Sequence, residues 1–113
     1  MKGKIVSFIG AIVGLSSPAH ASGSDYGLIT QIYGTHNGAV LFTVDAPRGP
    51  LPGCQYAALP KRWAIDASTV AGQAQVAVLL SAHARGKRVA ISGIHSCSIW
   101  GDTETVWYFV VED

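Results

Sequence analysis

The chain has 113 residues and carries eight Lys and Arg, seven Asp and Glu and four His, which gives a formal net charge of +1 at neutral pH. This length predicts one small domain with a modest core. Two of the lysines lie within the first four residues, and the rest of the chain has six basic residues against seven acidic ones, a net charge of −1. Because no basic stripe with interleaved aromatic residues is present, the composition argues against a nucleic-acid partner.

Residues 1–21 have the pattern of a secretory signal peptide. Two early lysines precede an apolar run over residues 5–15, and the segment ends in the small-x-small sequence AHA. The apolar run is too short to span a bilayer, so we do not expect membrane insertion. We predict cleavage after Ala21 and a mature chain of residues 22–113 that is secreted or periplasmic.

The mature chain contains two cysteines, Cys54 and Cys97. In a secreted chain this count predicts one disulfide bond. The bond closes a loop of about 44 residues, which the chain-entropy model values at roughly 4 kcal/mol. A metal pair and a catalytic thiol are the alternatives, and both are disfavoured because neither cysteine lies in a CxxC sequence or beside a motif histidine.

Alternating apolar residues predict a β-hairpin in the first half of the mature chain. The strands cover residues 27–33 and 40–44, and turn-forming residues fill positions 34–38. Residues 22–26 are small and polar, and we expect them to form a loose terminus. Residues 46–60 contain four prolines and two glycines, which predicts an irregular loop.

The second half of the mature chain predicts one helix among three further strands. The helix covers residues 69–85, and the strands cover residues 63–66, 87–93 and 105–111. A hairpin, a third strand, a helix and two more strands suit a single small α+β domain. We predict a five-stranded β-barrel of OB-fold type, with its helix between strands three and four.

The predicted helix has an unusual surface. Asp66, Ser68 and Thr69 compete to cap its start, and Gly86 suits the position after its end. Residues 67–84 contain no Asp, Glu, Lys or Arg, although an exposed helix usually has a charged face. One interpretation is an alanine-rich surface helix of good propensity. The other is that the second face packs against the same helix in neighbouring copies of the chain. The expected interface residues are Gln73, Ala74, Ala77, Val78 and Ser81.

The sequence shows no catalytic or metal-binding motif. His36, His83 and His95 lie in a turn, a helix and a loop, without metal-ligand spacing. A catalytic triad of Ser96, His95 and Asp102 can be drawn, but no nucleophile elbow supports it. We therefore predict no cofactor, no metal and no enzymatic activity, with a small hydrolase using His95 and Asp102 as the remaining enzymatic hypothesis.

A binding surface is the remaining functional signal. In the sequence Trp100-Gly101-Asp102-Thr103-Glu104 an aromatic ring lies beside two carboxylates, a combination that suits sugars. The exposed turn at residues 34–38 supplies a second polar loop. The alternative is that Trp100 fills core space against the disulfide. The candidate ligand-binding residues are Trp100, Asp102, Glu104, His36 and Asn37.

The chain resembles the B subunits of AB5-type bacterial toxins, especially those of subtilase cytotoxin and typhoid toxin. The likeness is one of spacing and covers most of the mature chain. It also resembles a group of short secreted bacterial proteins without assigned function, with segments like 63–73 and 97–108. The segments that carry the toxin resemblance are the signal peptide, residues 27–32, Cys54, residues 63–84, residues 86–91, Cys97 and Trp100.

The toxin resemblance implies an OB-fold subunit in a homopentameric ring, with helices lining a central pore and glycans bound on the ring. It also implies a toxin A subunit as a second partner. None of the family's sugar-contacting residues is carried over, because this chain is shorter and those positions do not align one by one. We therefore expect a secreted, self-assembling, glycan- or receptor-binding subunit. The alternative is a periplasmic interaction or inhibitor module without lectin activity.

Overall fold

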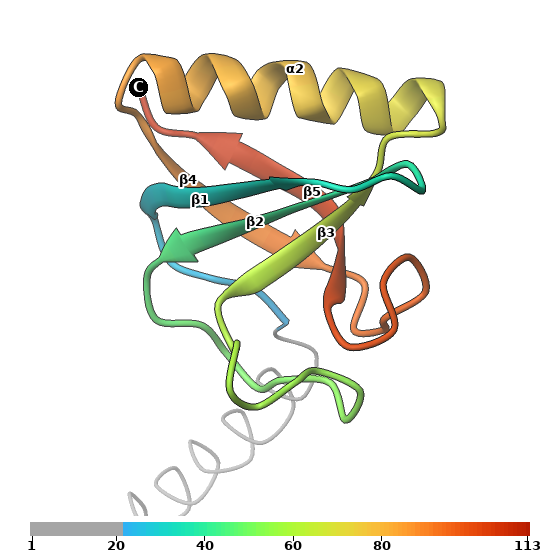
Figure 1. Ribbon diagram of the computed structural model, residues 1–113. Helices are drawn as coiled ribbons and strands as arrows, with labels where there is room; N and C mark the ends of the chain where they lie inside the picture. Colours follow the sequence, from blue (N-terminus) through green and yellow to red (C-terminus); the bar gives the residue numbers. More distant parts are fainter. Residues whose placement is uncertain (1–21) are drawn as a thin grey trace, which may run out of the picture.

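The computed structural model describes residues 22–113 (Figure 1). The predicted signal peptide, residues 1–21, lies outside the described residues. Within residues 22–113, no helix is long and apolar enough to cross a membrane.

The described chain contains five strands and one helix. All the predicted elements are confirmed, each end lies within one residue of its predicted position, and the helix lies between the third and fourth strands. The elements in chain order are β1 (Gly27–Gly34), β2 (Ala39–Asp45), β3 (Arg62–Asp66), α2 (Val70–Ala84), β4 (Arg88–Gly93) and β5 (Glu104–Val111).

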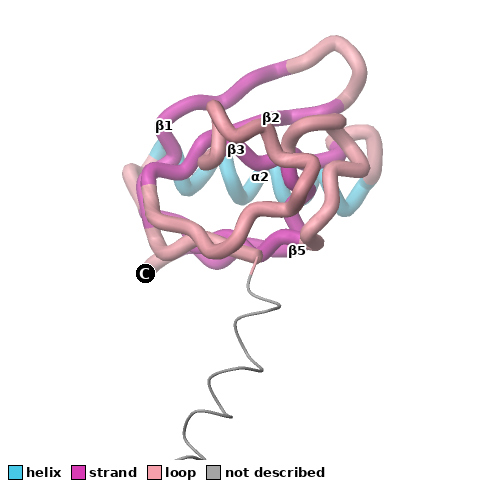
Figure 2. Tube along the Cα trace, turned by 90° about the horizontal axis from the view of Figure 1, so that it is seen from below, coloured by secondary structure: helices cyan, strands magenta, loops and turns pink. Residues whose placement is uncertain are grey.

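The five strands form one mixed sheet that closes on itself. Its order is β1-β2-β3-β5-β4, and β4 pairs back with β1. Every pairing is antiparallel except that of β3 with β5, which is parallel. Seen from below, the strands form a ring and α2 lies behind it, so the helix covers one end of the closed sheet (Figure 2).

The core lies inside the closed sheet and beneath the helix. Its largest fully buried side chains include Trp63, Phe42 and Ile65 from the strands, and α2 contributes Leu79 and Ala82. Val76 of α2 is partly buried and packs against this core, and most of the other α2 side chains are exposed. The remaining members of this core are Ile29, Val44, Ala46, Val89, Ile91 and Val106.

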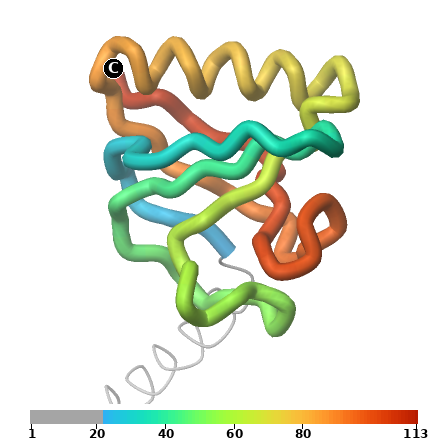
Figure 3. Tube along the Cα trace, in the orientation of Figure 1, coloured from blue at the N-terminus to red at the C-terminus, as the bar shows by residue number. Residues whose placement is uncertain are grey.

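The amino-terminal segment, residues 22–26, is part of the fold. Gly23 forms a β-bridge with Ser92, and Ser24 forms one with Arg48. The segment therefore runs between β4 and the loop after β2 (Figure 3). The prediction of a loose terminus is wrong, because backbone pairing to distant residues, which local composition does not reveal, holds the segment in place.

The predicted disulfide bond is confirmed. Cys54 and Cys97 are bonded, with 6.1 Å between their Cα atoms. The bond joins the irregular loop after β2, residues 46–61, to the loop between β4 and β5, residues 94–103. These two loops contain Arg48, His95 and Asp102.

Candidate functional site

The Trp100 ring packs against the protein and is not a free aromatic surface on which a sugar could stack. Its half-buried side chain packs on a small cluster made by Ala39, Leu41 and Ala64, together with Ile99. The cluster belongs to β2 and β3, so Trp100 fastens the loop after β4 onto the sheet. This favours the packing interpretation of Trp100, with the sheet rather than the disulfide as its main partner.

Asp102 forms an ion pair with a buried arginine. Its Oδ1 lies 2.7 Å from Arg62 Nη2 and accepts a further hydrogen bond from Thr103 Oγ1 at 3.0 Å. Arg62 Nε also donates to Thr103 Oγ1 at 2.9 Å, and its guanidinium lies 5.6 Å from the centroid of the Tyr33 ring. The Asp102 side chain is half-exposed, but it is paired with Arg62. This pairing weakens the prediction that Asp102 accepts hydrogen bonds from a sugar.

Glu104 is fully buried. Its Oε1 pairs with Arg48 Nη2, and its Oε2 accepts hydrogen bonds from the His95 backbone N–H at 2.7 Å and from Ser22 Oγ. The prediction that Glu104 faces a ligand is therefore wrong, because the closed sheet turns its carboxylate inward. In the sequence, Glu104 follows Asp102 in a polar stretch at the start of a strand, and this pattern does not indicate burial.

His36 and Asn37 remain exposed in the turn between β1 and β2. Asn37 Oδ1 accepts hydrogen bonds from Thr35 Oγ1 at 2.7 Å and from the Ala39 N–H at 3.4 Å, so its amide shapes the turn. Within residues 22–113, no hydrogen bond joins this turn to the loop of Trp100. Because Glu104 is buried, the five predicted ligand-binding residues do not all lie on the surface.

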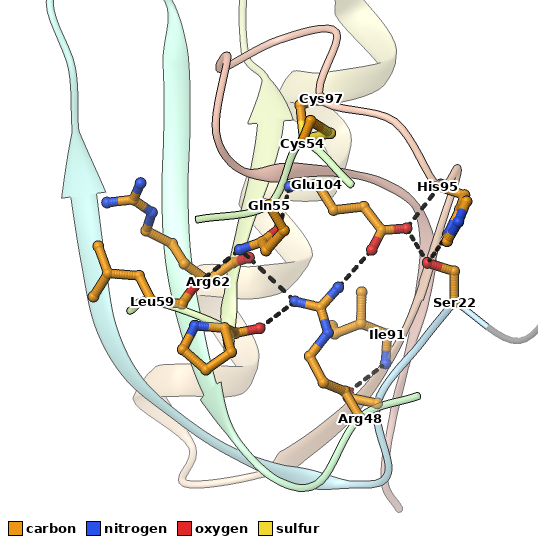
Figure 4. Close-up of polar contacts among 12 residues, drawn as sticks. Ser22, Arg48, Cys54, Gln55, Leu59, Arg62, Ile91, His95, Cys97 and Glu104 are labelled. Atoms are coloured by element: carbon orange, nitrogen blue, oxygen red, sulfur yellow. Dashed lines mark hydrogen bonds and ion pairs between the residues drawn. A yellow bond between two sulfur atoms is a disulfide. The ribbon is translucent and has the colours of Figure 1, made fainter. Parts of the chain in front are cut away.

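A polar cluster connects Arg48, Glu104, Ser22 and His95, and we call it the Arg48–Glu104 cluster (Figure 4). Ser22 and Glu104 are buried, whereas His95 is exposed. The Arg48 guanidinium carbon lies 3.8 Å from the centroid of the Trp63 ring, a cation–π contact. Arg48 Nη1 also donates to the Pro60 carbonyl. The sequence pattern does not predict this cluster, because a lone arginine in a proline-rich loop does not indicate its distant partner.

The electrostatics of the Arg48–Glu104 cluster indicate a structural role. Burial lowers the pKa of Arg48, and the charge and hydrogen bond of Glu104 oppose that change. An arginine stays protonated under such conditions, so Arg48 keeps its charge. Arg48 therefore joins the loop after β2 to the start of β5.

The drawn triad of Ser96, His95 and Asp102 is not assembled. His95 Nδ1 lies 3.2 Å from Ser22 Oγ, and the Asp102 carboxylate instead pairs with Arg62. Among the described residues, no group of three His, Cys, Asp or Glu side chains could hold a metal ion.

A groove with a mainly apolar lining lies on the outside of the first three strands. Its volume is about 150 Å³, and it combines hydroxyl, amide and cationic side chains with apolar contacts from the loop before β3. Lys61 at its edge forms an exposed ion pair with Asp45 at 3.1 Å. The lining residues are Gln31, Thr43, Ala58, Leu59, Pro60, Lys61 and Arg62.

An apolar groove of about 210 Å³ lies between α2 and β5, and we call its surroundings the α2–β5 face. Gln75 Nε2 donates to the Trp107 carbonyl at 2.9 Å and ties the helix to the strand. All five predicted interface residues, Gln73, Ala74, Ala77, Val78 and Ser81, are exposed on the helix. The groove is lined by Ala74, Gln75, Val78, Tyr108 and Phe109.

Comparison with known proteins gives no assignment. No protein-family model matches the chain, and comparisons with curated proteins and with solved structures give no match.

Proposed function

We propose that this protein is a secreted, disulfide-bonded binding subunit of OB-fold type that assembles with copies of itself and acts by binding rather than catalysis. The closed five-stranded sheet with a helix between β3 and β4 supports the OB-fold assignment. The disulfide supports an oxidising compartment. This architecture agrees with the resemblance to toxin B subunits.

The observation that carries self-assembly is the exposed apolar surface of the α2–β5 face. Trp107 is 64% exposed, Tyr108 50% and Val78 47%, and the two aromatic rings contact each other edge to face. A small domain seldom leaves such side chains together in solvent unless they cover a partner.

A second copy of the chain suits this face better than a charged partner. Residues 67–84 carry no Asp, Glu, Lys or Arg, so two helices can approach without like-charge repulsion. Ala74 and Ala77 leave room for close approach of the backbones. When one face meets a different face of the next copy, a closed ring forms if the rotation between copies closes. A pentamer is the ring size implied by the toxin resemblance.

A glycan is the proposed ligand, and the groove beside β1–β3 is the better candidate site. It offers the Gln31 amide, the Thr43 hydroxyl and the Lys61 ammonium around an apolar floor, which suits sugar hydroxyls and C–H faces. OB-folds bind oligosaccharides at their strand 2–3 face and adjoining loops. His36 and Asn37 lie in one such loop and stay candidate contacts, and a toxin A-type subunit stays a candidate partner.

Native mass spectrometry on the oxidised protein tests self-assembly. A discrete ring at micromolar concentration is the expected result, and Val78→Glu should convert it to monomer. Ile94→Glu is the matched control, because Ile94 is a β-branched residue of similar exposure, 44%, away from the α2–β5 face. A monomeric wild-type protein would contradict self-assembly and favour the interaction or inhibitor module.

A glycan array tests the ligand. We expect Lys61→Ala to reduce binding of a selected glycan by tenfold or more, which corresponds to about 1.4 kcal/mol. Lys87→Ala serves as the control lysine, since Lys87 lies before β4 and outside the groove. Equal binding by both variants would remove the groove from the proposal.

A further inference from the structure

The segment that starts the mature chain is held by backbone hydrogen bonds on both sides. The Gly93 N–H donates to the Ser22 carbonyl at 2.8 Å, and the Ser24 N–H donates to the Ile91 carbonyl at 2.9 Å. On the other side, the Gly49 N–H donates to the Gly23 carbonyl at 2.8 Å. Residues 22–24 therefore fill a fixed slot between β4 and the loop after β2.

The slot fits its occupant closely. A Cβ atom added at Gly23 would lie 2.5 Å from the Ile91 carbonyl oxygen, a distance that real Cβ atoms do not adopt. The position requires glycine because the backbones approach each other, so the segment has little freedom to shift along β4. Ser22 is consequently placed at a defined point of the fold.

At that point the Ser22 side chain enters the Arg48–Glu104 cluster (Figure 4). Ser22 is only 6% exposed, and its Oγ donates to Glu104 Oε2 and lies 3.2 Å from His95 Nδ1. Arg48 pairs with the other carboxylate oxygen, Oε1. The Oε2 side of the carboxylate is therefore faced by a hydroxyl and a backbone N–H, with no permanently charged donor.

The backbone nitrogen of Ser22 lies close to the same carboxylate. Within one serine, the nitrogen and Oγ are roughly 3–4 Å apart for any staggered side chain. Because Oγ bonds directly to Glu104 Oε2, the nitrogen lies within about 6 Å of the carboxylate. An opposite charge at that range stabilises an ionised group, and burial strengthens the effect.

We propose that the Arg48–Glu104 cluster is a binding site for the protein's own processed amino terminus. Cleavage of the Ala21–Ser22 peptide bond by water turns the Ser22 amide nitrogen into an ammonium group, which then becomes the second cationic partner of Glu104. In the precursor the same nitrogen is an uncharged amide. Removal of the signal peptide thus completes a buried ion-pair network. The inference rests on the cleavage after Ala21 that the proposed secretion requires.

The test uses the full chain exported from a bacterial host. The wild type is compared with a variant that carries one glycine inserted between Ala21 and Ser22, so that cleavage after Ala21 leaves the ammonium one residue away from its site. We expect the insertion to lower the melting temperature by about 5 °C, a typical response of a domain of this size to a small loss of stability. The α-amine of the wild type should also react with an acylating reagent several-fold more slowly than the α-amine of the insertion variant.

A second comparison separates charge from added length. The wild-type α-amine can be acetylated at pH ~6.5 in urea, where lysines are protected by their higher pKa, and the protein then refolded. Acetylation keeps the number of residues but removes the charge, so it should lower the melting temperature as the insertion does. Mock-treated, refolded wild type is the control.

The outcomes distinguish the inference from the proposed secretion. An intact mass that still includes residues 1–21 would overturn both. Cleavage at another position near Ala21 would overturn the ammonium site and leave secretion intact. An amino terminus at Ser22 with unchanged melting temperature after acetylation would overturn the ammonium site alone and leave secretion intact. An amino terminus at Ser22 with a lower melting temperature in both modified proteins supports the site.

Discussion

At the scale of single residues, the buried pair of Arg48 and Glu104 is the most consequential contact in the molecule. Two charges removed from water require mutual pairing and further hydrogen bonds to be tolerated. Glu104 meets this requirement through Ser22 and His95. Arg48 meets it in part, through Pro60 and the face of Trp63, while its Nε is buried without a hydrogen-bond partner in residues 22–113. The pair is thus a point at which three separate segments depend on one another.

Glu104→Gln should strongly destabilise the fold. The substitution leaves the shape almost unchanged but removes the charge that balances buried Arg48, and breaking such a pair typically costs about 3–5 kcal/mol. Urea unfolding followed by tryptophan fluorescence measures the change. Asp45→Asn is the control, because it breaks the exposed pair with Lys61, for which a loss below about 1 kcal/mol is expected. Equal effects of the two substitutions would contradict a structural role for Glu104.

Truncation of Trp100 should lower the stability of the monomer, whereas truncation of Trp107 should weaken self-assembly. Trp100 packs on Leu41 and Ala64, so Trp100→Ala should lower the free energy of unfolding by about 2–4 kcal/mol, somewhat less than for a fully buried ring. Trp107 is exposed, so Trp107→Ala should change the stability of the monomer little and instead weaken self-assembly. Unfolding and native mass spectrometry on both variants check this. Loss of assembly in Trp100→Ala with full stability would reverse the two assignments.

At the scale of elements, α2 is delimited by local chemistry. Thr69 caps its start, with Oγ1 accepting from the Gly72 N–H at 2.9 Å. Its end is a glycine turn in which Gly86 has φ of +65° and the Lys87 N–H donates to the Ala82 carbonyl. Short sequence signals therefore fix both ends of α2. The uncharged exposed face of α2 has no part in fixing these ends.

Gly72→Ala should destabilise the protein although alanine favours helices. Inside an exposed helix the substitution gains about 1 kcal/mol. Here the added Cβ would lie 1.7 Å from the Asp66 carbonyl oxygen, so β3 and α2 would have to separate. We expect a net loss of about 1–3 kcal/mol in thermal or urea unfolding. Gln73→Ala, on the next and exposed residue, is the control, and a stabilising Gly72→Ala would contradict the close contact.

At the scale of the whole molecule, the closed sheet and the disulfide bond act together. Cys54 holds Gln55 in place, and Gln55 Oε1 accepts the Glu104 N–H at 2.7 Å, so the disulfide also supports the start of β5. A small domain has limited apolar burial, and a covalent link between distant loops becomes a large part of its stability.

Removal of the disulfide should therefore lower stability by about 2–5 kcal/mol. Unfolding of the oxidised wild type is compared with that of the Cys54→Ser/Cys97→Ser double variant. Reductant should shift the wild type toward the double variant and leave the double variant unchanged. Identical unfolding curves for the oxidised wild type and the double variant would show that the closed sheet alone holds the two loops.

The sequence by itself determined the local elements, the helix caps and the disulfide pairing. Strand alternation and capping residues are read within a few neighbouring positions, and two cysteines allow one pair. Only the tertiary structure decided which polar groups are buried. Arg48 and Glu104 are 56 residues apart, and Ser22 and Glu104 are 82 apart. Such partners meet only when the sheet closes, so the inward Glu104, the paired Asp102 and the backbone pairing of residues 22–24 could not be found from local pattern.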